Sequence, residues 1–156
     1  MGTIECGGAV LGAIRDVIGG FFAKIGHDVS FESQAPGHGI AILTQKSGAS
    51  VREEQDITGA VLRTVVYPVS VAWRTGTMTE SVKLAVTGTL SQLADYLGGA
   101  PVELGGELLR LTLPELPGNV RIERIECGVP AAADAGEGGV TDRVLPVRFI
   151  IKQFIN

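Results

Sequence analysis

The amino-acid sequence predicts an α+β fold: a mostly antiparallel β-sheet with two helices packed on one face, a long extended arm and a long loop. The 156 residues fit one domain, residues 1–156. Two stretches repeat apolar residues every three or four positions, as helices do. The other apolar stretches alternate with period two and come in runs between the helices, which is typical of an antiparallel sheet.

The first helical pattern covers about residues 7–25. The glycine pair at 19 and 20 weakens its interior, and Gly26 provides a suitable end. Two short strands are expected next, at 28–32 and 39–44, joined by a turn that contains Pro36 and Gly37.

The middle of the chain contains a polar segment followed by the strongest strand pattern. Residues 51–56 are almost entirely polar and predict an exposed strand or arm. Residues 57–74 are rich in β-branched and aromatic residues and predict a long strand. Pro68 cannot donate a backbone hydrogen bond, so it indicates an edge, a bulge or a strand start.

The second helix is predicted at 79–97, with Thr79 as N-cap and Gly98-Gly99 as its end. Three further strands are expected at 107–113, 119–127 and 143–155. The small and acidic residues between the last two strands predict a flexible loop at 128–142.

Composition argues against several classes of protein. The net charge is −4 and the thirteen Lys and Arg are scattered, whereas a dedicated nucleic-acid binder needs a basic face. The apolar stretches are interrupted by Arg15, Asp16, Arg63 and Arg74, so no membrane span is expected. The N-terminus has no basic stretch of the signal-peptide type, so we expect synthesis in the cytoplasm.

No pattern of catalytic or metal-binding residues is present. His27 and His38 would need a third ligand to form a metal site. Cys6 and Cys127 are far apart in sequence and form no CxxC motif. We therefore expect no metal and no cofactor, and we do not expect an enzyme.

Two further motifs have simpler structural explanations. Glu53 and Glu54 are adjacent, so on a strand their carboxylates point to opposite faces. The glycine-rich segment 7–12 lacks both the Lys-Ser/Thr of a P-loop and a preceding strand.

The arm and the loop are long for a small monomer, and little in the sequence protects the sheet edges. These features favour a subunit that assembles with copies of itself or with neighbouring proteins. The charged residues of both segments are the candidate interface residues: Arg52, Glu53, Glu54, Asp56, Asp134, Glu137, Asp142 and Arg143. Charge reversal at Arg52, Glu53 or Glu54 is expected to impair assembly without lowering thermal stability.

The order of elements resembles the phage tail-terminator or minor-capsid (tail-completion) family. The resemblance rests on three stretches. They are the opening helix with two short strands, the strand at 65–74 that leads through 75–81 into a helix ending at 90–97, and the closing strand at 143–154.

The resemblance implies a structural virion protein that forms a ring, commonly of six copies. Such a ring caps the head-proximal end of the tail tube and contacts the neck proteins, while DNA passes through its lumen without specific binding. A tail-tube protein and another head–tail connector remain alternatives, and a small-molecule-binding α+β module is an alternative of a different class.

Overall fold

The computed structural model describes residues 2–31, 39–44, 50–75, 79–134 and 141–155. Its helices are α1 (Gly2–Ala23) and α2 (Glu80–Leu97). Its strands are β1 (Val29–Phe31), β2 (Gly39–Thr44), β3 (Ser50–Gln55), β4 (Val61–Thr75), β5 (Val102–Leu104), β6 (Glu107–Leu109), β7 (Val120–Cys127), β8 (Ala131–Asp134) and β9 (Thr141–Ile155). The predicted α+β class is confirmed.

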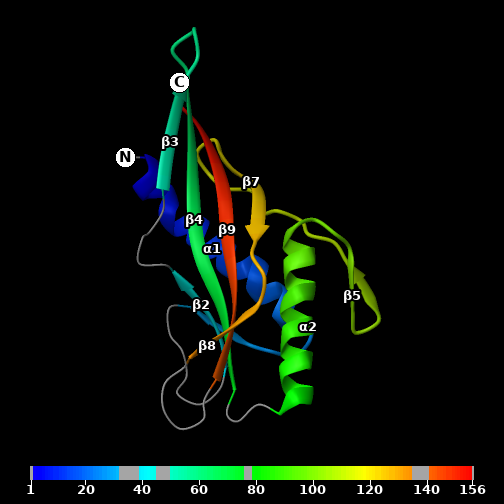
Figure 1. Ribbon diagram of the computed structural model, residues 1–156. Helices are drawn as coiled ribbons and strands as arrows, with labels where there is room; N and C mark the ends of the chain where they lie inside the picture. Colours follow the sequence, from blue (N-terminus) through cyan, green and yellow to red (C-terminus); the bar gives the residue numbers. More distant parts are fainter. Residues whose placement is uncertain (1, 32–38, 45–49, 76–78, 135–140, 156) are drawn as a thin grey trace.

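Two long antiparallel strands, β4 and β9, form the centre of the main sheet. Each has 15 residues, and they pair from Val61 opposite Ile155 to Thr75 opposite Thr141. Beside β4, strand β2 occupies one half and β3 the other. Beside β9, strands β7 and β8 divide the length in the same way. The central pair therefore determines where four shorter strands lie along the length of the sheet (Figure 1).

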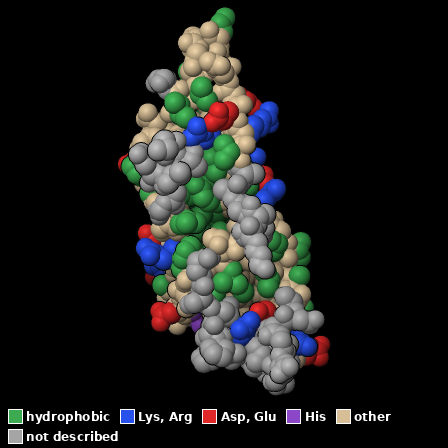
Figure 2. All heavy atoms as spheres, turned by 90° about the vertical axis from the view of Figure 1, so that its left-hand side faces the viewer, with side chains coloured by type: hydrophobic (Ala, Val, Ile, Leu, Met, Phe, Trp, Pro, Cys, Tyr) green, Lys and Arg blue, Asp and Glu red, His purple; other side chains and the backbone are tan. Residues whose placement is uncertain are grey.

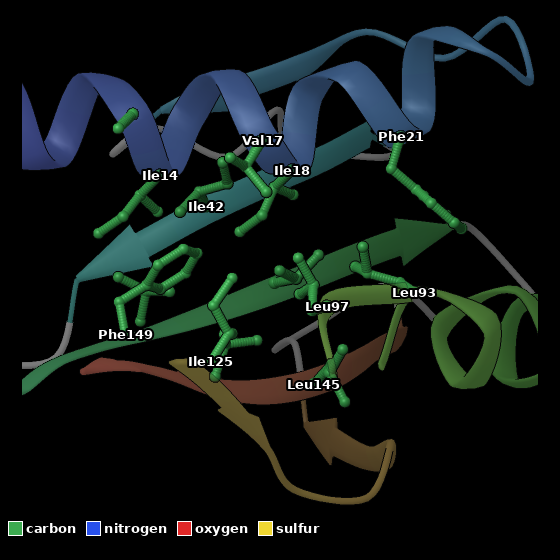
Figure 3. Packing of buried hydrophobic residues seen from close by; sticks show 14 of the residues in the cluster. Ile14, Val17, Ile18, Phe21, Ile42, Leu93, Leu97, Ile125, Leu145 and Phe149 are labelled. Atoms are coloured by element: carbon green, nitrogen blue, oxygen red, sulfur yellow. The ribbon is translucent and has the colours of Figure 1, made fainter. Parts of the chain in front are cut away.

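The two faces of the central pair differ in burial, because neighbouring side chains of a strand point to opposite faces. On β9, the alternate residues from Leu145 to Gln153 are buried, whereas Pro146, Arg148 and Phe154 are exposed. The buried face packs against both helices. Figure 3 shows Ile14 and Ile18 of α1 and Leu93 and Leu97 of α2 directed toward the sheet side chains Ile42, Phe149 and Leu145. Both helices cover one face, as predicted.

Aromatic contacts join α1 both to α2 and to the sheet. Phe21 of α1 lies 5.5 Å from Tyr96 of α2, between ring centroids. Phe22 lies 5.7 Å from Trp73 of β4, edge to face. Such contacts add to the free energy of burying the rings.

The predicted boundaries of the second helix are close to those observed. The Thr79 hydroxyl accepts a hydrogen bond from the Val82 N–H (3.4 Å), as an N-cap does. At the other end the Gly98 N–H donates to the Ala94 carbonyl, and Gly99 adopts a positive φ of 95°. The glycine pair ends the helix because the left-handed conformation costs glycine little.

A bidentate ion pair holds one end of the central strands together. Arg74 of β4 and Asp142 of β9 face each other in register. The Arg74 Nε donates to Asp142 Oδ1 (2.8 Å) and Nη2 donates to Oδ2 (3.1 Å). The hydrogen bond to Asp142 raises the pKa of Arg74 above its ordinary value. Asp142 is 8% exposed, so its carboxylate is largely removed from water. The hydrogen bonds of the ion pair take the place of those that both groups would otherwise make to water.

The segment 128–142, expected as a loop, contains part of the sheet. Ala131–Asp134 forms β8, which pairs with the start of β9, and β9 begins at Thr141. Residues 135–140 lie outside the described residues. The loop prediction is wrong for β8 because alanines have low strand propensity and show no alternation. Pairing with the exposed edge of β9 determines the conformation instead.

Other boundaries also differ from the sequence prediction. β1 pairs with β2 in parallel, which the expected two strands joined by a turn did not foresee, since a tight turn joins antiparallel strands only. Helix α1 begins at Gly2, and residues 57–60 form a turn before β4. β5 was not predicted; it forms a small hairpin with β6 through Gly105 and Gly106, both at positive φ.

One end of the sheet projects beyond both helices as a narrow arm (Figure 1). We define the hairpin arm as residues 50–66, which comprise β3, the connecting turn and the first part of β4. The end of β9 pairs along this arm, with Phe154 opposite Leu62.

Truncating two phenylalanines of β9 tests the assignment of the two faces. Phe149 is fully buried, so Phe149→Ala should lower the free energy of unfolding by about 3–5 kcal/mol. Phe154 is 44% exposed, so Phe154→Ala should cost about 1 kcal/mol or less. Urea unfolding of both variants measures the difference, and equal losses would contradict the assignment.

Candidate assembly interface

The hairpin arm exposes its side chains along most of its length. Residues 51–59 are all exposed. Within the described residues, β3 pairs with β4 alone, so its other edge lies at the margin of the sheet. A strand edge of this kind offers backbone donors and acceptors to another chain. The arm predicted from residues 51–56 is thus an edge strand.

The charged residues of β3 divide between the two faces of the arm. Arg52 and Glu54 share one face and form an ion pair of 2.9 Å, with exposed side chains. Glu53 points to the other face and accepts hydrogen bonds from Arg63 Nε (2.8 Å) and Nη2 (2.6 Å). The Arg63 side chain is only 17% exposed. Reversing Glu53 would leave this guanidinium against a positive charge, so we now expect a loss of stability there, unlike at Arg52 and Glu54.

The turn at the tip of the arm is built around Asp56. Its Oδ1 accepts hydrogen bonds from the Thr58 hydroxyl (2.6 Å), the Thr58 N–H (2.8 Å) and the Ala60 N–H (3.1 Å). The Asp56 N–H donates to the Ala60 carbonyl, and Gly59 has a φ of 92°. A three-residue hairpin loop with glycine in the left-handed region is a common connection. The bond from the Thr58 hydroxyl is the main reason that the pKa of Asp56 is lowered.

The tip presents an apolar side chain that the sequence analysis assigned to a strand. Ile57 is fully exposed, and Phe154 and Val51 are other exposed large hydrophobic residues of this end of the sheet. Ile57 was recognisable as a single apolar residue after a polar run and just before Thr58-Gly59. Exposed apolar side chains on a projecting arm are candidates for contact with another chain.

The face of β7 and β9 that the helices leave uncovered carries an ion-pair network. Arg148 Nη2 lies 2.6 Å from Glu126 Oε1, and Arg124 Nε lies 3.1 Å from Glu126 Oε2. The Arg124 hydrogen bond, followed by the charges of both arginines, lowers the pKa of Glu126. Arg124 and Lys152 also pair with Glu123. This face is therefore charged but largely balanced.

The remaining predicted interface residues do not join the arm. Asp142 is buried in its ion pair with Arg74, and Arg143 is half-buried opposite Trp73. The backbone of Asp134 pairs with Thr141, but its side chain and all of Glu137 lie outside the described residues. The structure thus groups Arg52, Glu53, Glu54 and Asp56 on the arm and places Asp142 and Arg143 at the other end of the central strands.

Seen from the side of β3, the molecule shows a band of hydrophobic side chains. Figure 2 shows this band in the middle of the view, below the narrow arm, with Lys, Arg, Asp and Glu side chains mostly toward the outline of the molecule.

Among the described residues, no three His, Cys, Asp or Glu side chains lie close enough to share a metal ion. Burial, with the charge of Asp95, raises the pKa of Cys127 to about 11, so its thiol is protonated at neutral pH. No helix in the described part of the chain is long and apolar enough to cross a membrane.

Comparison with known proteins gives a match in structure but none in sequence. No protein-family model matches the chain, and no curated protein matches it in sequence. A chain of the virion of a native gene transfer agent (GTA) particle superposes with a TM-score of 0.53 at 18% sequence identity. The match covers 92% of this chain and 98% of the other. The two chains therefore share a fold over nearly their whole length.

Titration of Asp56 tests the geometry of the tip. Its folded-state pKa is depressed, so its contribution to stability is present above the unfolded pKa and is lost as pH falls through the folded pKa. In an NMR titration we expect a midpoint below the ordinary aspartate value. Thr58→Val removes the hydroxyl donor and should raise that midpoint, whereas an unchanged midpoint would contradict this geometry.

Proposed function

We propose that the chain is a structural virion protein, a tail terminator of a phage-like particle. In this proposal its copies form a ring, of six subunits as in the family that the sequence resembles. The ring caps the head-proximal end of a tail tube and joins it to the neck proteins. The observation that carries the proposal is the projecting hairpin arm with its exposed β3 edge and exposed apolar tip.

The arm supports the proposal of assembly because an isolated monomer leaves both its strand edge and its apolar tip exposed. An exposed strand edge and an exposed isoleucine both favour unwanted association in solution. A defined partner surface removes that cost, and identical subunits most simply supply it to each other in a closed ring. Arg52, Glu54 and Asp56 then form the polar rim of the contact.

The fold comparison supports the virion setting. The matching chain comes from a GTA virion, and the shared fold covers almost all of it. The net charge of −4 suits a channel through which DNA passes without binding. The proposed place of the protein is accordingly the tail or neck of the virion.

Charge reversal on the arm tests the proposal. Glu54→Lys should raise the concentration needed for ring formation at least about tenfold. The reversed charge at the rim of the contact is then repelled by the partner surface that attracted the carboxylate. The melting temperature should stay unchanged, since Glu54 is exposed. Sedimentation velocity across a concentration series measures both the mass of the assembly and the concentration at which it forms.

A matched control distinguishes the arm from net charge. Glu103→Lys makes the same change of charge on β5, away from the arm, and should assemble like the unmodified protein. Equal behaviour of the two variants would count against the arm as the interface. Growth of the unmodified protein into long tubes would instead indicate a tail-tube protein.

A further inference from the structure

The tip of the arm is an apolar side chain on a hydrogen-bonded turn. Ile57 is fully exposed, yet the turn that carries it is fixed by three hydrogen bonds to Asp56 Oδ1 and by the Asp56–Ala60 backbone bond. An apolar side chain held in one position loses little conformational freedom when it docks. The tip therefore has the properties of an anchor residue in a protein–protein contact.

The same end of the molecule has a shallow hollow on each side of Phe154, and each is lined by both apolar and polar residues. The β3-side hollow, of about 280 Å³, is lined by Glu54, Gln55, Asp56, Ala60, Val61, Leu62 and Phe154. The β7-side hollow, of about 490 Å³, is lined by Asn119, Val120, Arg121 and Phe154.

The β7-side hollow is held in place by the start of β7. The Phe154 N–H donates to the Asn119 carbonyl (3.2 Å), and Asn119 adopts a positive φ of 58° after Gly118. The Arg121 guanidinium lies over the Phe154 ring, 5.3 Å from its centroid. This cation–π contact places a positive charge at the rim of an aromatic surface.

Charge distinguishes the two hollows as receptors for the tip. The tip carries the Asp56 carboxylate, whose pKa is lowered, so it is ionised at neutral pH. The β3-side hollow is lined by Glu54 and by Asp56 itself, which would repel a second acidic tip. Arg121 of the β7-side hollow would attract it. Charge complementarity therefore favours the β7-side hollow.

The tip and the β7-side hollow belong to opposite edges of one sheet. At the end of the sheet that carries the arm, the strand order is β3, β4, β9, β7. Ile57 lies in the turn between the first two of these strands. The full exposure of Ile57 shows that it does not occupy its own hollow. Complementary features on opposite edges produce a head-to-tail contact between copies, which closes into a ring when the rotation permits.

We propose that Ile57 of one copy docks in the β7-side hollow of the next copy, against Phe154, with Asp56 facing Arg121. The inference rests on the proposed assembly of identical subunits and specifies the contact that joins them. It makes the tip and the hollow two halves of one interface.

Mixing two variants of the full chain tests this contact. Ile57→Asp removes the anchor but keeps the hollow, and Arg121→Glu makes the hollow repel Asp56 but keeps the anchor. Each alone should assemble at least about tenfold more weakly than the unmodified protein. An equimolar mixture should form pairs of one chain of each kind, because one intact contact is then available. Native mass spectrometry identifies such pairs by mass.

Two further substitutions serve as matched controls. Leu108→Asp changes another exposed apolar residue, on β6, and Arg110→Glu reverses another exposed arginine. Both should assemble normally.

The outcomes separate this contact from the proposed function. Rings of unchanged stability in Ile57→Asp and Arg121→Glu would overturn the contact but leave the ring, and the hollow would then be free for a different protein. Weakened assembly of each variant without mixed pairs would also overturn it. An unmodified protein that stays monomeric at every concentration would overturn both the contact and the ring.

Discussion

The full-length pairing of β4 with β9 is the constraint on which the rest of the structure depends. Its 15 residue pairs define one register, and a shift by one residue would turn Leu145, Val147 and Phe149 away from the helices. The Arg74–Asp142 ion pair is satisfied only in this register. The same pairing extends past the helical layer, so it also supports the hairpin arm and places Phe154 beside it. The core and the candidate interface are thus set by one pair of strands.

Patterns within single segments allowed much of this fold to be predicted. The α2 boundaries follow from Thr79 and Gly98, and alternation revealed β7 and β9. Pairings between segments that are far apart in the sequence could not be predicted from patterns within single segments. The alanines of β8 become a strand because β9 offers an edge, and the parallel contact of β1 with β2 depends on how the chain returns between them. A segment's own residues do not encode these contacts.

The candidate interface could likewise be predicted only in part from local sequence patterns. The polar run at 51–56 indicated an exposed arm, and the structure places it on an edge strand. Charge alone, however, did not separate exposed Glu54 from Glu53, which supports the half-buried Arg63. It also grouped Asp142 with the interface, although its partner Arg74 lies far away in sequence. The apolar residues Ile57 and Phe154 were overlooked because their significance depends on the shape of the arm, which brings the turn and the C-terminal strand to one end.

The central claim is that this chain is the subunit of a closed ring. Negative-stain electron microscopy of the purified protein at high concentration tests it most directly, because it displays the symmetry as well as the size of any assembly. The account predicts uniform rings with a central hole. Fields of particles no larger than a single chain, or tubes that lengthen without limit, would contradict it.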